Sequence, residues 1–185
     1  MSLAVISKRV RDRSVGPEIP DADYDDPKEL YAFFGLAAYC AGLLELSLVN
    51  LLATVRLADP SVVPALESDS IFDELHKRTF GALLLRAQRL GLLDADTRAL
   101  LDNARERRNH LVHHYFRLHA STALRPDGVR QMIDELRDMA IVFRAADDVA
   151  DPLWRRECAT LGISQEDLDA ELDRMVAEQQ ARDDV

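Results

Sequence analysis

One long apolar stretch, residues 26–58, sets the architecture to which the other segments must adapt: DPKELYAFFGLAAYCAGLLELSLVNLLATVRLA. Its start has the features of a helix N-terminus, with Asp26 as the N-cap, Pro27 at the first helical position and an acid, Glu29, in the first turn. Apolar residues then recur on nearly every side. We therefore expect a helix that runs to about Ala58 and lies at the centre of a bundle or in an interface.

The same stretch is not expected to cross a membrane. Glu45 interrupts the apolar run Leu30–Leu44 after about 15 residues, short of the roughly 20 that a spanning helix needs. No secretory signal is predicted, since Met1–Ile6 is too short for an apolar core region. Cys40 and Cys158 lack metal-ligand spacing and are interpreted as reduced thiols. These features predict a cytoplasmic protein without membrane contact.

Residues that typically start or stop helices divide the remainder of the chain. The predicted starts are Ser70 with Asp73, Asp94 or Asp96, the turn Pro126–Gly128, Pro152, and Ser164 with Asp167. The predicted breaks and stops are residues 79–81, Gly91, about His119, and Gly162. No window shows sustained alternation of apolar and polar residues, so no sheet is expected.

We therefore expect an all-α protein. Residues 27–149 are predicted to form a four- to five-helix bundle of the up-and-down type. Residues 1–26 show no clear period and are interpreted as a flexible N-terminal arm. Residues 150–185 are predicted to form an acidic C-terminal helical extension.

Charge is distributed unevenly over the chain, whose net charge is −10. Residues 134–185 carry 15 acids against 6 arginines, whereas the other residues carry 18 acids against 17 Lys and Arg. The segment His76–Arg108 is locally basic, with 8 Lys and Arg against 4 acids. A protein with a net negative charge generally binds nucleic acids poorly. Because this segment is locally basic, the net charge neither supports nor excludes a local nucleic-acid site.

Three of the five histidines fall in RERRNHLVHHYF, residues 105–116. On an ideal helix of about 100° per residue, one arc about 120° wide collects apolar side chains and predicts the core face. Its members are Leu100, Leu101, Ala104, Leu111, Val112, Tyr115 and Leu118. Arg108 falls in the same arc, so its guanidinium must reach solvent, form an ion pair or face a cleft.

Two further faces of this helix are polar. Asn109 and His113 form one, with Phe116 beside them, and we interpret it as a contact surface, such as one for a second copy of the chain. His110 and His114 form the other. Two histidines at this spacing are half of many zinc sites. Because no third ligand is placed nearby, we expect no metal, and the chemistry below requires no cofactor.

Arg108 and His113 lie about 140° apart on the same wheel. They share a site if the arginine curls round, if the helix is distorted, or if a second chain supplies the opposite group in a two-fold cleft. There, a neutral His takes the proton from a ribose 2′-OH, a protonated His protonates the leaving 5′-oxygen, and Arg stabilises the phosphate. This chemistry requires RNA. Simple nucleotide binding uses the same residue types.

The segment Arg108–His113 has the form R-N-x-x-x-H and resembles the signature of HEPN domains (higher eukaryotes and prokaryotes nucleotide-binding). The resemblance implies an all-α dimer with the motif at the dimer cleft. Many members are metal-independent ribonucleases of toxin–antitoxin, phage-defence and RNA-processing systems. It further implies catalytic roles for Arg108 and His113 and a supporting role for Asn109. Family members often carry a polar residue in an early helix that faces the motif, here Glu45.

The longer form R-x4-H-x-Y, completed by Tyr115, resembles HEPN toxins whose antitoxin is a small nucleotidyltransferase that adenylylates the tyrosine. This resemblance implies that Tyr115 is a modification site, whereas the helical wheel places it on the core face. His110 and His114 are interpreted as flanking residues that assist with substrate.

Three functional hypotheses follow, and the sequence alone leaves open whether the chain is an enzyme. The first is a cytoplasmic homodimer that cleaves RNA as a toxin or phage-defence effector, with an antitoxin or another protein as a further partner. The second is a non-catalytic HEPN-like interaction or regulatory module that binds through its acidic C-terminal helices. The third is a plain helical dimer whose histidines are interface polar groups.

Overall fold

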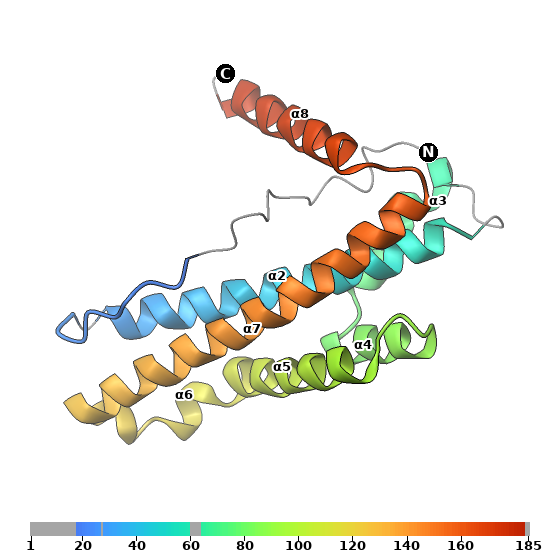
Figure 1. Ribbon diagram of the computed structural model, residues 1–185. Coiled ribbons are helices and arrows are strands. Elements are labelled where there is room, and N and C mark those ends of the chain that lie inside the picture. Colours follow the sequence, from blue (N-terminus) through green and yellow to red (C-terminus); the bar gives the residue numbers. More distant parts are fainter. Residues whose placement is uncertain (1–17, 27, 60–63, 184–185) are drawn as a thin grey trace. The chain divides into compact units, whose positions relative to one another are not determined.

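A computed structural model describes residues 18–26, 28–59 and 64–183 (Figure 1). The described residues contain no strand, which confirms the all-α class. Their elements are α2 (Glu29–Leu57), α3 (Pro64–His76), α4 (Phe80–Arg89), α5 (Ala95–His113), α6 (Tyr115–Leu118), the 3-10 helix η1 (Thr122–Leu124), α7 (Pro126–Thr160) and α8 (Gln165–Asp183).

Helix α2 begins close to its predicted start, where the backbone N–H of Lys28 donates to Asp26 Oδ1 at 2.8 Å. Every residue from 47 to 54 is buried, so this part of α2 is enclosed on all sides. Of the described helices, α2 alone is long and apolar enough to cross a membrane. Glu45 therefore does not shorten the apolar run below that limit, although a soluble core helix passes the same test.

The chain divides into two compact units. The α3 unit contains residues 46–86 and 150–183 of the described chain, and the α5 unit contains residues 18–45 and 87–149. Both α2 and α7 run through the two units. The predicted boundary at residue 150 coincides with a change of unit, but it lies inside α7.

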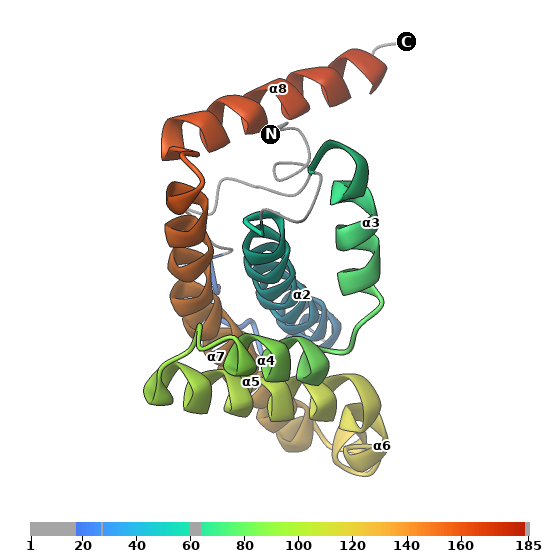
Figure 2. The ribbon, with the colours of Figure 1, turned by 90° about the vertical axis from the view of Figure 1, so that its right-hand side faces the viewer.

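In the α3 unit, α2 runs between α3 and the end of α7 (Figure 2). Trp154 Nε1 donates to Thr54 Oγ1 at 3.1 Å, and both side chains are buried. The prediction that Pro152 starts a new helix is wrong, because α7 continues through it. A proline inside a helix removes one backbone hydrogen bond and costs about 3 kcal/mol. Burial of Trp154 and Cys158 in the following turns offsets that cost.

Several local signals act as predicted. Asp94 Oδ1 accepts the Thr97 N–H at 2.8 Å and caps α5. Gly91 ends α4 in the left-handed region, with a φ of 69° that a glycine adopts without strain. Ser164 and Asp167 form the reciprocal capping box that starts α8.

The turn Pro126–Gly128 separates two helices differently from the prediction, since α7 begins at Pro126 itself. A Cβ atom on Gly128 would lie 2.1 Å from the Thr122 carbonyl oxygen. The backbone of η1 therefore approaches the first turn of α7 so closely that only glycine fits there.

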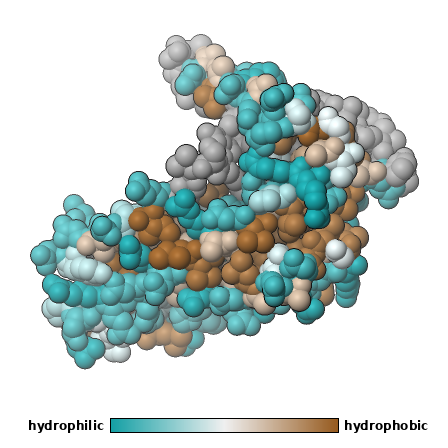
Figure 3. Space-filling model, viewed as in Figure 1, coloured by the Kyte–Doolittle hydropathy of each residue, from teal (hydrophilic) through white to brown (hydrophobic). Residues whose placement is uncertain are grey.

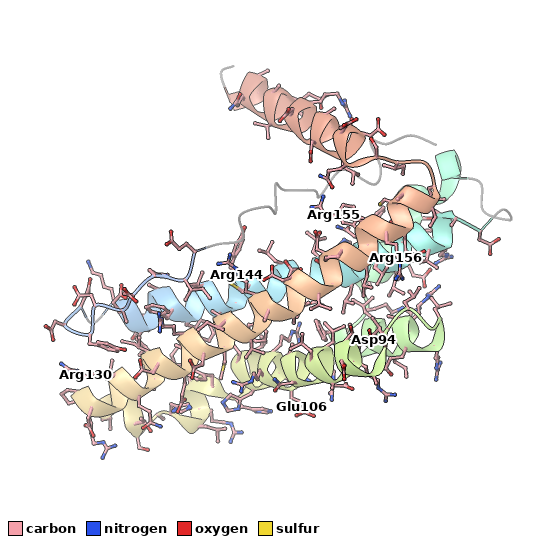
Figure 4. All side chains as sticks on the ribbon, in the orientation of Figure 1. Asp94, Glu106, Arg130, Arg144, Arg155 and Arg156 are labelled. Carbon is pink, nitrogen blue, oxygen red and sulfur yellow. The ribbon has the colours of Figure 1, made fainter. Side chains whose placement is uncertain are left out.

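The part of the predicted N-terminal arm that the structure describes, residues 18–26, lies along α7, and residues 1–17 are outside the described chain. Tyr24 donates to Asp134, and Arg137 donates to the Pro20 carbonyl oxygen at 3.3 Å. Arg130, labelled in Figure 4, belongs to α7. Its side chain pairs with Asp25 at 3.3 Å. Polar contacts thus hold this segment against one face of α7.

Candidate functional site

The α5 unit brings three of the predicted site residues together around one guanidinium. Arg108 Nη2 lies 3.3 Å from Glu45 Oε2, which joins α5 to α2. Arg108 Nη1 lies 3.5 Å from Asn109 Oδ1, at the outer limit of a hydrogen bond. The side chains of Arg108 and Glu45 are 24% and 27% exposed. Arg108 was expected to reach solvent, form an ion pair or face a cleft. The structure shows the ion pair, and the arginine side chain remains partly exposed.

His113 is the last residue of α5 and is exposed. Its ring centroid lies 6.1 Å from that of His114. Within the described chain, no hydrogen bond joins His113 to Arg108. Both residues lie in α5, where a separation of five residues sets them about 140° apart around the helix axis.

The histidine helix breaks where the ideal wheel assumed continuity. Helix α5 ends at His113, and α6 starts at Tyr115, with His114 between them at φ −131° and ψ −22°. The expectation of one helix to about His119 is therefore wrong. The side chains of His110 and His114, which were expected to form one stripe of the helix, contact different neighbours. His110 packs edge-on against Tyr115 at 5.9 Å, whereas His114 is exposed and its Nδ1 lies 3.4 Å from Arg117 Nη2.

Tyr115, the first residue after the break, is buried. Its side chain is 1% exposed, and its hydroxyl donates to the Met132 carbonyl oxygen of α7 at 2.8 Å. Burial, and to a smaller extent the charge of Glu135, raise the pKa of the Tyr115 hydroxyl. The core position expected from the wheel is confirmed for Tyr115. An adenylyl group reaches this hydroxyl only when the segment opens.

His119 belongs to this cluster, although the sequence did not single it out. Its ring lies 4.5 Å from the Tyr115 ring, and its Nε2 lies 3.2 Å from Glu135 Oε2. The spacing of Tyr115 and His119 by four residues was a visible signal. The pairing with Glu135 was not, because it depends on how α7 returns alongside α6.

An apolar surface lies beside His113. Val112 and Leu118 are 53% and 54% exposed, so their predicted core positions are wrong. Phe116 is exposed and packs against Phe34 and Tyr31 of α2, with ring centroids 4.8 and 6.4 Å apart. Apolar residues are also present on the molecular face drawn in Figure 3.

The N-terminal half of α2 contributes an uncharged exposed face, because no charged residue lies between Glu29 and Glu45. The exposed members of this α2 face are Tyr31, Ala32, Gly35, Ala38, Tyr39 and Gly42. A Cβ atom added at Gly35 or Gly42 would meet no atom within 4 Å. This face therefore combines two exposed tyrosine rings with two glycines that have open space around them.

Among the described residues, neither metal ligands nor thiols form a further candidate site. No group of three or more His, Cys, Asp or Glu side chains suited to a metal ion occurs in the described part of the chain. Cys40 and Cys158 are buried, and burial raises the pKa of each thiol to about 11. Both thiols are therefore protonated at neutral pH and weak nucleophiles.

No known protein family, curated protein or solved structure matches this chain. The resemblance to HEPN domains therefore depends on the short motif alone.

A double-mutant cycle measures the ion pair that holds Arg108. Glu45→Gln and Arg108→Gln are expected to show a coupling free energy of about 1 kcal/mol in urea unfolding, because the pair is largely shielded from water. The control is the exposed pair Arg98–Asp102, at 3.7 Å on the surface of α5. There we expect less than about 0.5 kcal/mol. Equal coupling in the two cycles would contradict a special role for Glu45.

Unfolding at alkaline pH tests the packing role of Tyr115. The folded chain raises the pKa of this hydroxyl above the ordinary value of about 10. Its contribution to stability is therefore present below that pH and is lost as the pH rises above it. At about pH 8 we expect Tyr115→Phe to lose about 1 kcal/mol, and we expect this difference to shrink by about pH 11. The control is Tyr31→Phe, which removes a hydroxyl from an exposed ring. A Tyr115→Phe variant as stable as the wild type at both pH values would contradict the packing role.

Proposed function

We propose that this chain is a metal-independent endoribonuclease of HEPN type that acts as a homodimer in the cytoplasm. The observation that carries the proposal is Arg108, held between Glu45 and Asn109 while His113 stands exposed at the end of the same helix. These are the residues of the R-N-x-x-x-H motif, and Glu45 occupies the expected place in an early helix.

The residues account for a balanced transesterification. His113 takes the proton from a ribose 2′-OH, and the 2′-oxygen attacks phosphorus. The bond from phosphorus to the 5′-oxygen breaks, and a protonated His113 from the second copy gives a proton to the leaving oxygen. Arg108 binds the non-bridging oxygens, where negative charge builds up. The products are a 2′,3′-cyclic phosphate and a free 5′-hydroxyl.

Glu45 and Asn109 position Arg108 in this scheme. A guanidinium with two neighbours already in place loses less side-chain freedom when it binds a phosphate. Because Glu45 is 27% exposed, the ion pair is not sealed in the core. The guanidinium therefore has N–H groups that it can direct to a phosphate without leaving the carboxylate.

A second copy completes the site, because Arg108 and His113 point to different sides of α5. The α2 face and the exposed Val112 and Phe116 provide an uncharged, apolar surface next to His113. Apolar exposed surface of this kind is typical of the core of a protein–protein interface. Two-fold pairing through it places each His113 near the boundary with the other copy.

The biological role proposed with this activity is that of a toxin or phage-defence effector whose partner is an antitoxin. The form R-x4-H-x-Y supports it. Enclosure of the Tyr115 hydroxyl requires that a modifying partner first open the segment around His114.

A second candidate function is a non-catalytic interaction or regulatory module, favoured by one observation. Glu45 already neutralises Arg108, as expected of a structural ion pair. A truncation that removes the acidic helix α8 tests this alternative by its effect on partner binding. The truncated chain must end after Thr160, because α7 continues to that residue. Full RNA-cleaving activity that depends on His113 argues against this alternative.

Cleavage of a labelled single-stranded RNA tests the proposed activity. His113→Ala and Arg108→Ala are each expected to lower the rate by about 100-fold or more, and a chelator is expected to leave it unchanged. Arg98→Ala is the control, since Arg98 is an exposed residue of the same helix outside the motif. Equal rates for wild type and His113→Ala, or no cleavage by the wild type, would refute the catalytic role.

Light scattering after size-exclusion chromatography tests the dimer. Gly35→Glu adds a charge to the α2 face without a clash inside the chain, because no atom lies within 4 Å of the new Cβ. We expect it to convert a dimer into a monomer that remains helical. Leu124→Glu, at an 83% exposed position in η1, is the control and should stay dimeric. A monomeric wild type would refute the two-fold cleft.

A further inference from the structure

Three arginines of the α3 unit converge on a single carboxylate, that of Glu74 near the end of α3. Arg56, in the last turn of α2, places Nη1 2.5 Å from Glu74 Oε2. Arg78, between α3 and α4, places Nη2 3.1 Å from Glu74 Oε1, and Arg86 of α4 places Nη1 3.9 Å from the same oxygen. We call these three residues with Glu74 the arginine cluster.

The arginine cluster has more positive charge than its carboxylate can neutralise. Three guanidiniums face one carboxylate, so its net charge is +2. Hydrogen bonds from Arg56 and then Arg78 lower the pKa of the Glu74 carboxyl, which therefore stays ionised.

The guanidiniums remain available to a ligand. The side chains of Arg56, Arg78 and Arg86 are 33%, 55% and 41% exposed. Each guanidinium has five N–H donors, far more in total than one carboxylate accepts. Glu74 holds the three groups close together, which lowers the entropy that a ligand must remove to bind them.

The chemistry of the arginine cluster favours phosphate. Arginine donates paired hydrogen bonds to carboxylates and phosphates alike, and a phosphodiester has two charged, non-bridging oxygens in a similar geometry. An open, partly exposed surface suits successive phosphates of a chain better than one enclosed small anion. The cluster lies in or beside the basic stretch of the sequence, outside the acidic residues 134–185 that account for most of the net charge.

We propose that Arg56, Arg78 and Arg86 form a binding site for the phosphodiester backbone of single-stranded RNA. The ligand class depends on the proposed ribonuclease function, which the arginine cluster extends with a substrate-holding surface in the α3 unit. Binding here is independent of base sequence, because the arginines contact phosphates.

Fluorescence anisotropy with a labelled oligouridylate tests this proposal in the full chain with His113→Ala, which prevents cleavage during the measurement. Arg78→Ala/Arg86→Ala is expected to weaken binding at least tenfold at about 50 mM salt. It is also expected to reduce the slope of log K against log salt by about 1.4, since each phosphate contact to a single strand contributes about 0.7. Circular dichroism confirms that the variant is folded.

The matched control is Arg174→Ala/Arg182→Ala, which removes the same charge from the exposed surface of α8. We expect its affinity and salt slope to stay close to those of the parent. An equal loss in both double variants would overturn the proposal, because binding would then reflect net charge alone. Absence of oligouridylate binding by the parent chain would also overturn it.

The result is separable from that of the cleavage assay. If wild type fails to cleave RNA but the arginine cluster variants lose oligouridylate binding, the cluster is upheld and only the catalytic role fails. If wild type cleaves RNA and the cluster variants bind and cleave as it does, the cluster is refuted and the catalytic role stands. Competition by inorganic phosphate at concentrations equal to those of oligouridylate phosphate would overturn the preference for a polyanion.

Discussion

Complete enclosure of α2 between residues 47 and 54 is the constraint on which the helical arrangement depends. More than two turns of helix have no exposed side, so packing on one face is insufficient and neighbours must surround them. Ser47, Asn50 and Thr54 are buried there with the apolar residues, which makes polar partners necessary. Trp154 supplies one of them by donating to Thr54. Continuation of α7 past Pro152 is therefore a requirement of covering α2.

The N-terminal half of the same helix has the opposite character, and the proposed dimer depends on this difference. Residues 31–42 are covered on one side and expose an uncharged face on the other. Glu45 lies between the partly exposed residues 31–42 and the enclosed residues 47–54, and its carboxylate pairs with Arg108. One helix thus supplies a structural core, a proposed contact surface for a second copy, and the carboxylate that positions the proposed phosphate-binding group.

Features governed by neighbours in the sequence were predictable. The start of α2, the cap at Asp94, the stop at Gly91 and the capping box at Ser164 each depend on a few consecutive residues. The all-α class follows from the same local patterns. An ion pair was one of the three outcomes expected for Arg108, and Glu45 was the polar residue expected to face the motif; their pairing agrees with both expectations.

Features governed by contacts between distant residues were not predictable. The break at His114 precedes Tyr115, whose hydroxyl donates to the Met132 carbonyl, a contact that an ideal helical wheel does not represent. Leu118 follows this break, and it was assigned to the core and is exposed. Val112 precedes the break and is exposed as well, because no neighbouring element of the described chain covers that side of α5. The convergence of Arg56, Arg78 and Arg86 on Glu74 depends on three elements meeting, so the sequence showed only a basic segment.

Because α2 and α7 are continuous through both units, the two units cannot be separated by a single cut in the chain. Each unit is assembled from segments far apart in the chain, and the connections at residues 45–46 and 149–150 are helical turns rather than linkers. A protease that cuts loops releases neither unit intact, and no single truncation yields one of them. Neither unit can therefore be produced without the rest of the chain. An added module is best placed in a loop or at a terminus, where it does not interrupt a helix that both units share.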